Sequence, residues 1–394
     1  MNAKAGPKQT RRAVLKTLSG TGLALLGESL ALRLYASEPA VDPRVEKIVR
    51  DTISVDMHNH SAQPPFTQSS QAAQQFPVVD LKGQMQKSGL TAICLTYAID
   101  SYRSPKPDEW YQYHLQILSY IDRTLEQNGM HRALRMADLR AAHKAKIPIV
   151  IQDCEGAQWI EGHLERIEEA YKRGLRHLQL VHQMHALVSP IGGVQQLIQP
   201  KGGNQNSAPV DVTGLTPFGV DVIRECNRLG IVVDLAHATE AAVVAALKVA
   251  QQPLVVTHTA LDNSLGRSDK MYIGDPGLTA RLVSTSYVKA VADAGGVVGV
   301  WHIFPTLKEY VTAVKQMADV AGVDHTGIGT DTSIAPPPGR RGGGTNAIWP
   351  DQSAGFLYAV VSEMLAQGFH PEEIAKIAGG NYCRVFGKVT EGHV

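Results

Sequence analysis

The sequence alternates short apolar runs with longer stretches in which apolar residues recur at helical spacing. Apolar runs of about four to eight residues bounded by turn residues are typical of buried strands, and i, i+3, i+4 spacing is typical of amphipathic helices. This pattern predicts strands at residues 54–56, 92–96, 147–152, 177–180, 232–234, 254–257, 296–300 and 326–329. It predicts helices at residues 111–126, 164–172, 218–229, 240–249, 286–294, 307–321 and 355–367.

Strands that alternate with helices predict an α/β fold with a parallel sheet, and eight such units are typical of a TIM-like (β/α)8 barrel. An open, doubly wound sheet shows the same alternation. No GxGxxG sequence follows the first predicted strand, which disfavours the dinucleotide-binding form of that alternative. Since no linker, charge block or repeat divides residues 41–390, we predict a single barrel domain there.

The first 40 residues have the features of an export leader. Arg11 and Arg12 are followed by apolar residues and Lys16, and then by a Gly/Ala/Leu-rich stretch at residues 18–32. This is the pattern of a twin-arginine signal, although an ordinary basic helix is the alternative. The stretch is too short and too polar to span a membrane stably. We therefore expect residues 1–40 to engage the twin-arginine export machinery, and the protein to be periplasmic or otherwise exported.

Composition excludes several classes of protein. The chain has 394 residues, of which 44% are hydrophobic, so it can bury a large core. The formal net charge of +1 provides no long-range field for binding nucleic acid or anionic lipid. The four cysteines are widely separated and form no CxxC pair, which argues against a zinc ribbon and against a disulfide-dense fold.

Polar residues with metal-binding or acid–base chemistry stand at the ends of the predicted strands. In a (β/α)8 barrel, the carboxyl ends of all strands meet at one mouth, where active sites are built. Seven residues that are far apart in the chain are therefore expected to converge: His58, His60, Glu155, His182, His237, His258 and Asp331.

Two pairs of histidines predict two metal sites. His58 and His60 are alternate residues of an extended segment, so both can face the barrel mouth and hold one metal ion. His237 and His258 close successive strands and can hold a second ion. Neutral imidazole is a good ligand for zinc, and an incomplete ligand set leaves a position for water.

The acidic residues at these strand ends complete the predicted chemistry. Glu155 could bridge the two metals through its two oxygens, or it could cap a helix; Asp153 remains an alternative ligand. Asp331 could take a proton from the attacking water and pass it to the leaving amine, although it could also cap a helix. His182 is better suited to donate to the substrate carbonyl oxygen as charge develops there.

Other hydrolytic mechanisms lack their sequence signals. The chain has no GxSxG sequence, which disfavours a serine hydrolase with a nucleophile elbow. It has no HExxH sequence for a helix-borne zinc protease site. Cys154 stands beside Glu155, but a cysteine at a strand end is more often a buried packing residue than a nucleophile.

Longer motifs resemble those of the membrane dipeptidase (renal dipeptidase) family of metallopeptidases, which are amidohydrolase-like barrels. The resemblance runs from about residue 45 to residue 386. It is carried by the segment around His58 and by Cys154-Glu155-Gly156, residues 171–182, Gly214-Leu215-Thr216-Pro217-Phe218-Gly219, Asn227-Arg228-Leu229-Gly230, Asp234-Leu235-Ala236-His237, Gly327-Ile328-Gly329-Thr330-Asp331 and residues 380–386.

The resemblance implies a zinc-dependent dipeptidase that cleaves small dipeptides with a hydroxide bridging two zinc ions. It implies that Glu155 bridges the ions, that His58 and His60 hold one and that His237 and His258 hold the other. It further implies that His182 contacts the substrate carbonyl and that Asp331 handles protons. Arg267 is the nearest match to the arginine that binds the substrate carboxylate, a task that suits a guanidinium fork. Members of the family often form homodimers.

Two departures from the family pattern keep other functions open. The family usually has His-x-Asp after the first strand, where this chain has His58-Asn59-His60, and Asp331 is followed by Thr-Ser-Ile rather than Phe-Asp-Gly. The first change adds positive charge to the site, and the second alters a loop that lines the pocket. The alternatives are a metal-dependent amidohydrolase acting on another small amide or lactam, and a non-catalytic family member in an exported maturation pathway.

Overall fold

Parallel strands form the centre of the computed structural model, which describes residues 41–61, 63–64, 75–99, 106–182, 215–262, 281–336 and 344–393. Eight strands pair in the order β1-β2-β3-β4-β5-β6-β8-β9. Their bounds are Val55–Asn59 (β1), Ala92–Ala98 (β2), Ile149–Glu155 (β3), Leu175–Gln179 (β4), Val232–Asp234 (β5), Val255–Leu261 (β6), Val297–Val300 (β8) and Thr326–Ile328 (β9). All the predicted strands are confirmed; the short β7, Leu282–Val283, pairs with β6 and was not predicted.

The last and first strands meet beyond the end of β9. The backbone N–H of His60 donates to the carbonyl of Thr332 at 2.7 Å, and that of Asp331 donates to the carbonyl of His58 at 3.0 Å. Asn59 and Thr332 form a parallel bridge. The strands therefore form a nearly closed parallel barrel, which confirms the predicted TIM-like (β/α)8 fold.

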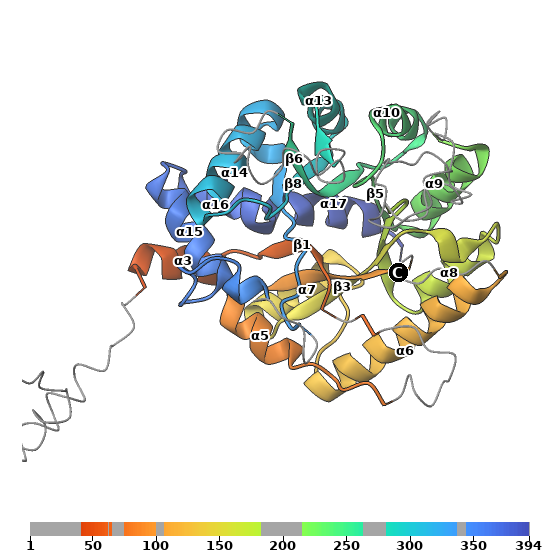
Figure 1. The fold of residues 1–394 in the computed structure, drawn as a ribbon, viewed down its shortest axis with the longest axis horizontal. Coiled ribbons are helices and arrows are strands. Elements are labelled where there is room, and N and C mark those ends of the chain that lie inside the picture. Colours follow the sequence, from red (N-terminus) through yellow and green to blue (C-terminus); the bar gives the residue numbers. More distant parts are fainter. Residues whose placement is uncertain are drawn as a thin grey trace, which may run out of the picture. The chain divides into compact units, whose positions relative to one another are not determined.

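Helices surround the strands (Figure 1). They are α3 (Pro43–Asp51), α5 (Leu81–Ser88), α6 (Glu109–Asn128), α7 (Met136–Ala145), α8 (Glu165–Lys172), α9 (Pro217–Leu229), α10 (Glu240–Val249), α13 (Thr285–Asp293), α14 (Leu307–Ala321), α15 (Phe356–Ala366), α16 (Pro371–Ala375) and α17 (Asn381–Thr390). Every predicted helix is confirmed, whereas α3, α5, α7, α16 and α17 were not predicted. Among the described residues, no helix combines the length and apolarity that a membrane crossing requires.

Residues Asp42–Val394 cluster into one compact unit. The predicted leader, residues 1–40, lies outside the described residues.

The amino end of the barrel is closed by α17, which crosses behind the strands in Figure 1. Tyr382, Val385, Phe386 and Val389 of this helix belong to one buried apolar cluster with the first residues of several strands. Burying a large side chain of this kind stabilises the fold by roughly 1.5–3 kcal/mol. Because this end is filled, the opposite, carboxyl end is left for a site.

The inner wall of the barrel contains a close backbone approach between three strands. The register of β6 against β8 shifts between Val256 and Thr259, so the chain at Thr257 departs from the regular pattern. A Cβ atom added at Gly299 or at Gly329 would lie 2.0 or 1.8 Å from the Thr257 carbonyl oxygen. Only glycine can stand at these two positions without moving the backbone that carries the next residue, His258.

A buried histidine outside the barrel mouth, His114, is expected to make the stability of the fold sensitive to acid. His114 stacks on Trp159 at a centroid distance of 3.9 Å, and its Nδ1 lies 3.2 Å from the Tyr97 hydroxyl. Burial, followed by the positive charges of Arg173 and Arg166, lowers the pKa of His114 to about 3. Between about pH 6.5 and pH 3, the unfolded chain therefore binds a proton that the folded protein excludes.

We expect this proton to reduce the free energy of unfolding by up to about 1.4 kcal/mol for each pH unit below 6.5. The free energy of unfolding of metal-free protein can be measured by urea denaturation between pH 6 and pH 4. In His114→Phe it should depend less steeply on pH, and the difference in slope should correspond to nearly one bound proton. Equal slopes in the two proteins would show that His114 does not carry this linkage.

Candidate metal centre

Strand alternation places the predicted ligands on the inner face of the barrel. Asp56, His58 and His60 are alternate residues of the β1 segment, and Asp153 and Glu155 are alternate residues of β3. The sequence predicts that the histidines and the glutamate follow their strands, and His60, His182 and His237 do. By contrast, His258 lies within β6, His58 lies within β1 and Glu155 is the last residue of β3, because strand pairing continues to these positions.

Glu155 lies at the centre of the converging side chains. Its Oε2 is 3.3 Å from Nε2 of His60, and its Oε1 is 3.5 Å from Nε2 of His237. Nε2 of His182 lies 3.4 Å from the same Oε1. The first short helix after Glu155 starts only at Gln158 and has Ala157 at its N-cap, so Glu155 is not a helix cap. Oε1 also lies 3.6 Å from Nε2 of His58, so this oxygen faces imidazoles of both predicted pairs, whereas Oε2 faces His60.

The imidazoles form two close pairs. Nε2 of His58 lies 3.1 Å from Nε2 of His60, and Nε2 of His237 lies 2.9 Å from Nε2 of His258. Asp331 joins the first pair, with Oδ1 at 3.2 Å from Nε2 of His60. The structure thus brings together all seven residues predicted to converge.

Two of these residues have unusual backbone conformations. His237 has φ 67° and Asp331 has φ 53°, in the left-handed region that side chains other than glycine rarely adopt. Such conformations cost on the order of 1–3 kcal/mol and persist where the surrounding structure over-determines them. Here, they turn the two side chains into the barrel mouth immediately after β5 and β9.

The donor set fits divalent metal ions. Two nitrogen ligands of one tetrahedral zinc, each at about 2.0–2.1 Å, stand about 3.3 Å apart, and both Nε2 pairs approach this spacing. Oε2 of Glu155 is buried and accepts no hydrogen bond within the described residues, although an ionised oxygen there needs a cationic partner. Groups whose ligand atoms lie within 4.8 Å of one another are His58–His60–Glu155, His58–His258–Asp331 and Glu155–His182–His237.

These groups agree with the predicted ligand sets in part. His58, His60 and Glu155 form one group as predicted. His258 lies with His58 and Asp331 in another, and His182 joins Glu155 and His237. His182 is therefore within ligand range as well as substrate range, and its predicted role stays a prediction.

The carboxylates in the cluster are held in their charged forms. Burial alone would raise the pKa of Glu155, but the neighbouring histidines, His182 and His58 first, outweigh it and hold that pKa well below its usual range. Burial likewise opposes the ionisation of Asp331, and His258, His60 and Arg281 overcome it. The metal-free site thus presents two anionic groups to a cation.

Asp153, the alternative ligand, lies behind the site. Its Oδ2 is 3.7 Å from Nδ1 of His58, on the side of the ring away from Glu155, and accepts a hydrogen bond from Thr96 at 2.7 Å. Asp234 lies in the same buried layer, with Oδ2 3.7 Å from Nε2 of His177. Burial raises the pKa of Asp153, whereas His177 outweighs burial and lowers the pKa of Asp234, so Asp234 adds negative charge beneath the cluster.

Three site residues were missed by sequence reasoning. Arg281 lies 3.1 Å from Oδ2 of Asp331, and its guanidinium stacks 3.6 Å from the ring centroid of Trp301. His302, next to Trp301, bonds the carbonyl of Thr330 through Nδ1. Trp301 and His302 follow β8, which, like β2, has no predicted site residue. Arg267, the predicted carboxylate-binding residue, lies outside the described residues.

Cys154 has no access to a substrate. It is fully buried on the outer face of β3, and its thiol donates to the carbonyl of Gly156 at 3.4 Å. Burial, with the nearby Asp153 carboxylate, raises the pKa of the thiol well above its usual value. The four cysteines are all free and buried. A cysteine nucleophile is therefore excluded at this site.

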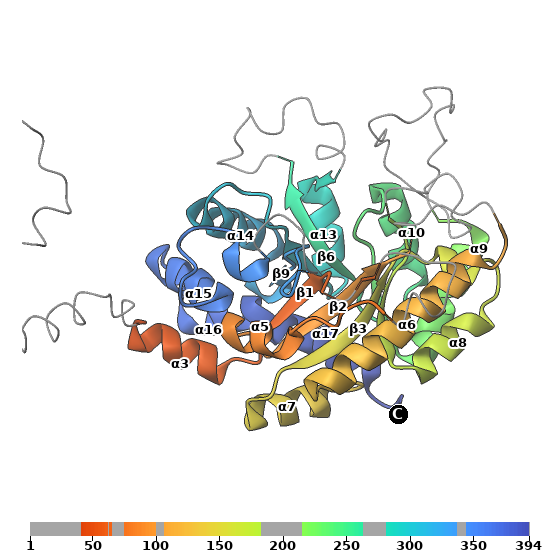
Figure 2. The same cartoon turned by 60° about the horizontal axis from the view of Figure 1, so that its bottom comes forward.

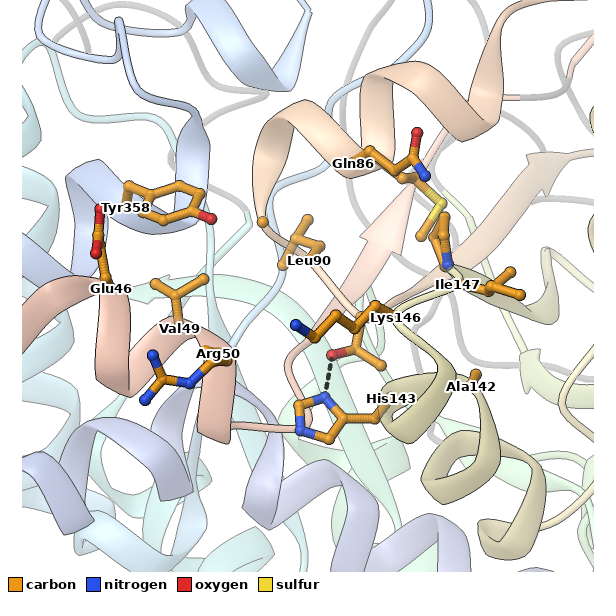
Figure 3. Close-up of a pocket in the computed structure, with 14 residues that line it drawn as sticks. Glu46, Val49, Arg50, Gln86, Leu90, Ala142, His143, Lys146, Ile147 and Tyr358 are labelled. Atoms are coloured by element: carbon orange, nitrogen blue, oxygen red, sulfur yellow. Dashed lines mark hydrogen bonds between the residues drawn. The ribbon is translucent and has the colours of Figure 1, made fainter. Parts of the chain in front are cut away.

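A separate cavity of about 390 Å³ lies where β2 and β3 begin, at the amino end of the barrel. Figure 3 shows Arg50, Lys146 and His143 around it, with His143 bonded to Thr91 at 3.2 Å. Residues of α3, α5, α7 and α15 line it, and α3 and α7 lie at the lower edge of the barrel in Figure 2. It contains none of the converging residues and is not the catalytic site.

Comparison with known proteins agrees with this geometry. Residues 43–393 match the family model described as membrane dipeptidase (peptidase family M19). Dipeptidase tcpJ of Claviceps purpurea (strain 20.1) is 28% identical over 287 residues, covering 70% of this chain and 60% of that protein. Dipeptidase 3 of Mus musculus is 27% identical over 187 residues, or 46% of this chain and 34% of that protein. The chain thus spans less than two thirds of either relative's length.

A solved structure shows the same fold. The probable dipeptidase PvdM of Pseudomonas aeruginosa superposes with a TM-score of 0.67 at 17% identity, covering 89% of this chain and all of that one. At this identity the likeness supports the barrel alone, whereas the family model matches nearly the whole described unit. The chain therefore belongs to the membrane dipeptidase family, peptidase family M19.

Proposed function

We propose that the protein is a two-zinc dipeptidase that hydrolyses the amide bond of small dipeptides. The observation that carries the proposal is the Glu155 carboxylate, which directs one oxygen toward His60 and the other toward His237. A carboxylate placed between two imidazole groups suits two metal ions that share one bridging ligand. Family membership and the dipeptidase names of the two relatives support the substrate class.

The chain's own residues divide the work of hydrolysis. His58 and His60 would hold one ion, His237 and His258 the other, and Glu155 both. Zinc bound there would lower the pKa of water to supply a hydroxide nucleophile near neutral pH and would polarise the scissile carbonyl.

Asp331 and His182 act on the reacting groups. Asp331, held as a carboxylate, accepts the proton of the attacking water and returns it to the leaving amine. His182 donates a hydrogen bond to the carbonyl oxygen as negative charge develops there.

The test pairs metal content with turnover. Protein of residues 41–394 is expected to contain about two zinc equivalents and to hydrolyse members of a panel of L,L and L,D dipeptides. Asp331→Asn should keep both ions, because none of the proposed metal ligands changes. It should lower kcat by about 10²–10⁴-fold, because the general base is lost. Less than one ion per chain would overturn the two-metal site.

The same experiment separates the alternatives. Two ions without dipeptide turnover would favour a metal-dependent amidohydrolase for another small amide or lactam, for which the change to His60 and the altered segment after Asp331 are the motivation. Inactivity on a wider amide and lactam panel would favour a non-catalytic role in an exported maturation pathway.

We further propose that Arg281 anchors the free carboxylate of the dipeptide. Its guanidinium carbon lies over the Trp301 ring and one of its nitrogens reaches Asp331, so two contacts orient the guanidinium beside the site. Arg281→Lys keeps the charge but loses the planar fork. We expect KM for free dipeptides to rise at least about tenfold, the loss typical of a hydrogen bond to a charged group.

The control for Arg281 is a dipeptide whose C-terminus is amidated. Without a carboxylate to bind, its KM should change by less than about twofold between wild type and Arg281→Lys. A similar KM increase for both substrates would mean that Arg281 only positions Asp331. Arg267 would then become the candidate anchor.

We also propose that residues 1–40 direct export by the twin-arginine route. The adjacent Arg11 and Arg12 and the weakly apolar stretch after them support this proposal. Full-length protein should reach the periplasm of a bacterial host, and Arg11→Lys combined with Arg12→Lys should retain it in the cytoplasm. Export of the double variant at the wild-type level would contradict the proposal. Homodimer formation stays a prediction, which light scattering of the mature chain can check.

A further inference from the structure

One buried hydroxyl touches ligands of both predicted metal sites. Oγ1 of Thr257 lies 2.9 Å from Nδ1 of His258 and 3.4 Å from Nδ1 of His58. The two rings are themselves close, with centroids 3.9 Å apart. Thr257 is fully buried, so water cannot replace its hydroxyl. The residue therefore lies between one imidazole of each predicted pair.

The hydrogen bonds of this hydroxyl can be assigned. Oγ1 of Thr257 donates its single proton to Oδ2 of Asp234 at 2.5 Å. The other oxygen of Asp234 accepts the backbone N–H of Ala236 at 2.9 Å and that of Thr257 at 3.1 Å, so the carboxylate is fixed. A hydroxyl has one proton and two lone pairs. With the proton used, Thr257 can only accept from the two imidazoles.

This assignment determines which tautomer each ring adopts in its neutral form, the form that binds a metal ion. A neutral ring that donates through Nδ1–H has its lone pair on Nε2. Nε2 of His58 faces Glu155 at 3.6 Å, and Nε2 of His258 faces the same oxygen at 3.8 Å. Both nitrogens thus have the form that a metal ion requires, and both point toward the proposed bridging carboxylate.

We propose that Thr257, held by Asp234, is a positioning residue that couples the two metal sites, so that binding of one ion strengthens binding of the other. The proposal rests on the two-metal function proposed above. An ion on His58 orients that ring and thereby fixes one lone pair of Thr257. The second lone pair is then already aimed at His258, which loses less freedom when the next ion binds. Coupling of this kind is reciprocal between the two ions.

A register shift in β6 and two glycines on neighbouring segments accommodate Thr257. The register shift in β6 brings Thr257 and His258 together at the inner wall, although neighbouring strand residues normally face opposite sides. Gly299 and Gly329 leave the space that the Thr257 carbonyl occupies. These contacts hold the backbone of Thr257, and the bond to Asp234 holds its hydroxyl, so the two imidazole contacts of the hydroxyl are geometrically linked.

The test is zinc binding to metal-free protein, measured by competition with a chromogenic chelator. Thr257→Val keeps the side-chain shape and removes the hydroxyl, whereas Thr257→Ser restores it. We expect wild type to bind two ions cooperatively. In Thr257→Val both affinities should fall by about 10–100-fold, as for other residues that support metal ligands, and the Hill coefficient should fall to about one. Thr257→Ser should stay within about threefold of wild type.

Thr326→Val is the matched control, because Thr326 is another buried strand threonine, and its hydroxyl donates to the backbone carbonyl of Gly322, four residues earlier, at 3.0 Å. It should bind both ions as wild type does. Circular dichroism of each metal-free variant checks its fold. If Thr257→Val does not fold, Asp234→Asn serves instead: its amide can donate to Oγ1, which turns the hydroxyl proton toward one ring, and cooperativity should fall.

The outcomes separate this inference from the proposed function. Wild type that binds two ions independently overturns the coupling and leaves the dipeptidase proposal standing. Cooperative binding that persists in the Thr257 variants also overturns it. Wild type that binds less than one ion overturns the two-metal function, and the coupling with it.

Discussion

Replacing Glu155 with glutamine is expected to abolish dipeptide hydrolysis and to remove at least one of the two zinc ions. The carboxylate faces both imidazole pairs, and an amide can offer only one oxygen and no charge. A lost zinc ion would no longer polarise the reacting carbonyl, which removes several kcal/mol of transition-state stabilisation. This loss corresponds to a fall in kcat on the order of 10³-fold or more. Metal analysis and initial rates at saturating zinc measure the two effects.

The metal-free protein provides the control for this variant. In excess chelator at neutral pH, Glu155→Gln should lower the free energy of unfolding, because the histidines that hold the pKa of Glu155 low lose their charged partner. Zinc should stabilise wild type strongly and the variant weakly. Glu165→Gln changes an exposed carboxylate, 70% accessible, and should behave as wild type. If Glu155→Gln retains two ions and full activity, Glu155 does not bridge the two ions.

A large loss of stability is expected when Gly329, on the inner wall of the barrel, is replaced by alanine. Gly329→Ala would place a Cβ atom 1.8 Å from the Thr257 carbonyl oxygen. That oxygen belongs to the backbone and cannot rotate away as a side chain can. We expect a loss of about 3 kcal/mol or more in the free energy of unfolding, and impaired zinc binding because His258 moves with Thr257. Urea denaturation and zinc titration measure these changes.

Gly387→Ala separates this clash from a general effect of replacing glycine. Gly387 lies in the middle of α17, and an added Cβ would meet only Met136 atoms, at 3.6 Å, which is ordinary contact. Alanine in a helix is favoured over glycine by about 1 kcal/mol, so this variant should be neutral or more stable. If Gly329→Ala retains wild-type stability, the approach of Thr257 to β9 is not the reason for glycine at that position.

The barrel and its ligand set were predictable because both depend on local periodicity. Strands such as β2 and β6 are apolar runs too short for helices, and helices such as α14 have clear amphipathic spacing. Since parallel strands in a barrel end at one mouth, positions such as His58 and Glu155 could be brought together without coordinates. Their exact place was less predictable, because strand ends depend on how far the neighbouring strands continue to pair.

The family motifs assigned roles to the predicted site residues but did not identify every residue of the site. Arg281 follows a chain segment whose path the sequence does not indicate, and no periodic pattern marks an isolated arginine as a site residue. Trp301 and His302 follow β8 without the strand-end motif that identified the other positions. Helix α17 was missed although it fills the amino end of the barrel, because its role depends on contacts with strands far away in the sequence.

The sequence by itself determined the class of fold, the family, the strand-end histidines and carboxylates, and the expectation of a metal-dependent hydrolase. Only the tertiary structure decided that Asp153 lies behind His58 rather than among the ligands, that Arg281 joins Asp331, and that Thr257 contacts an imidazole from each pair. The reason is physical. Periodicity and motif spacing act along the chain, whereas these contacts depend on strand register, on bulges and on glycines that allow separate segments to approach one another.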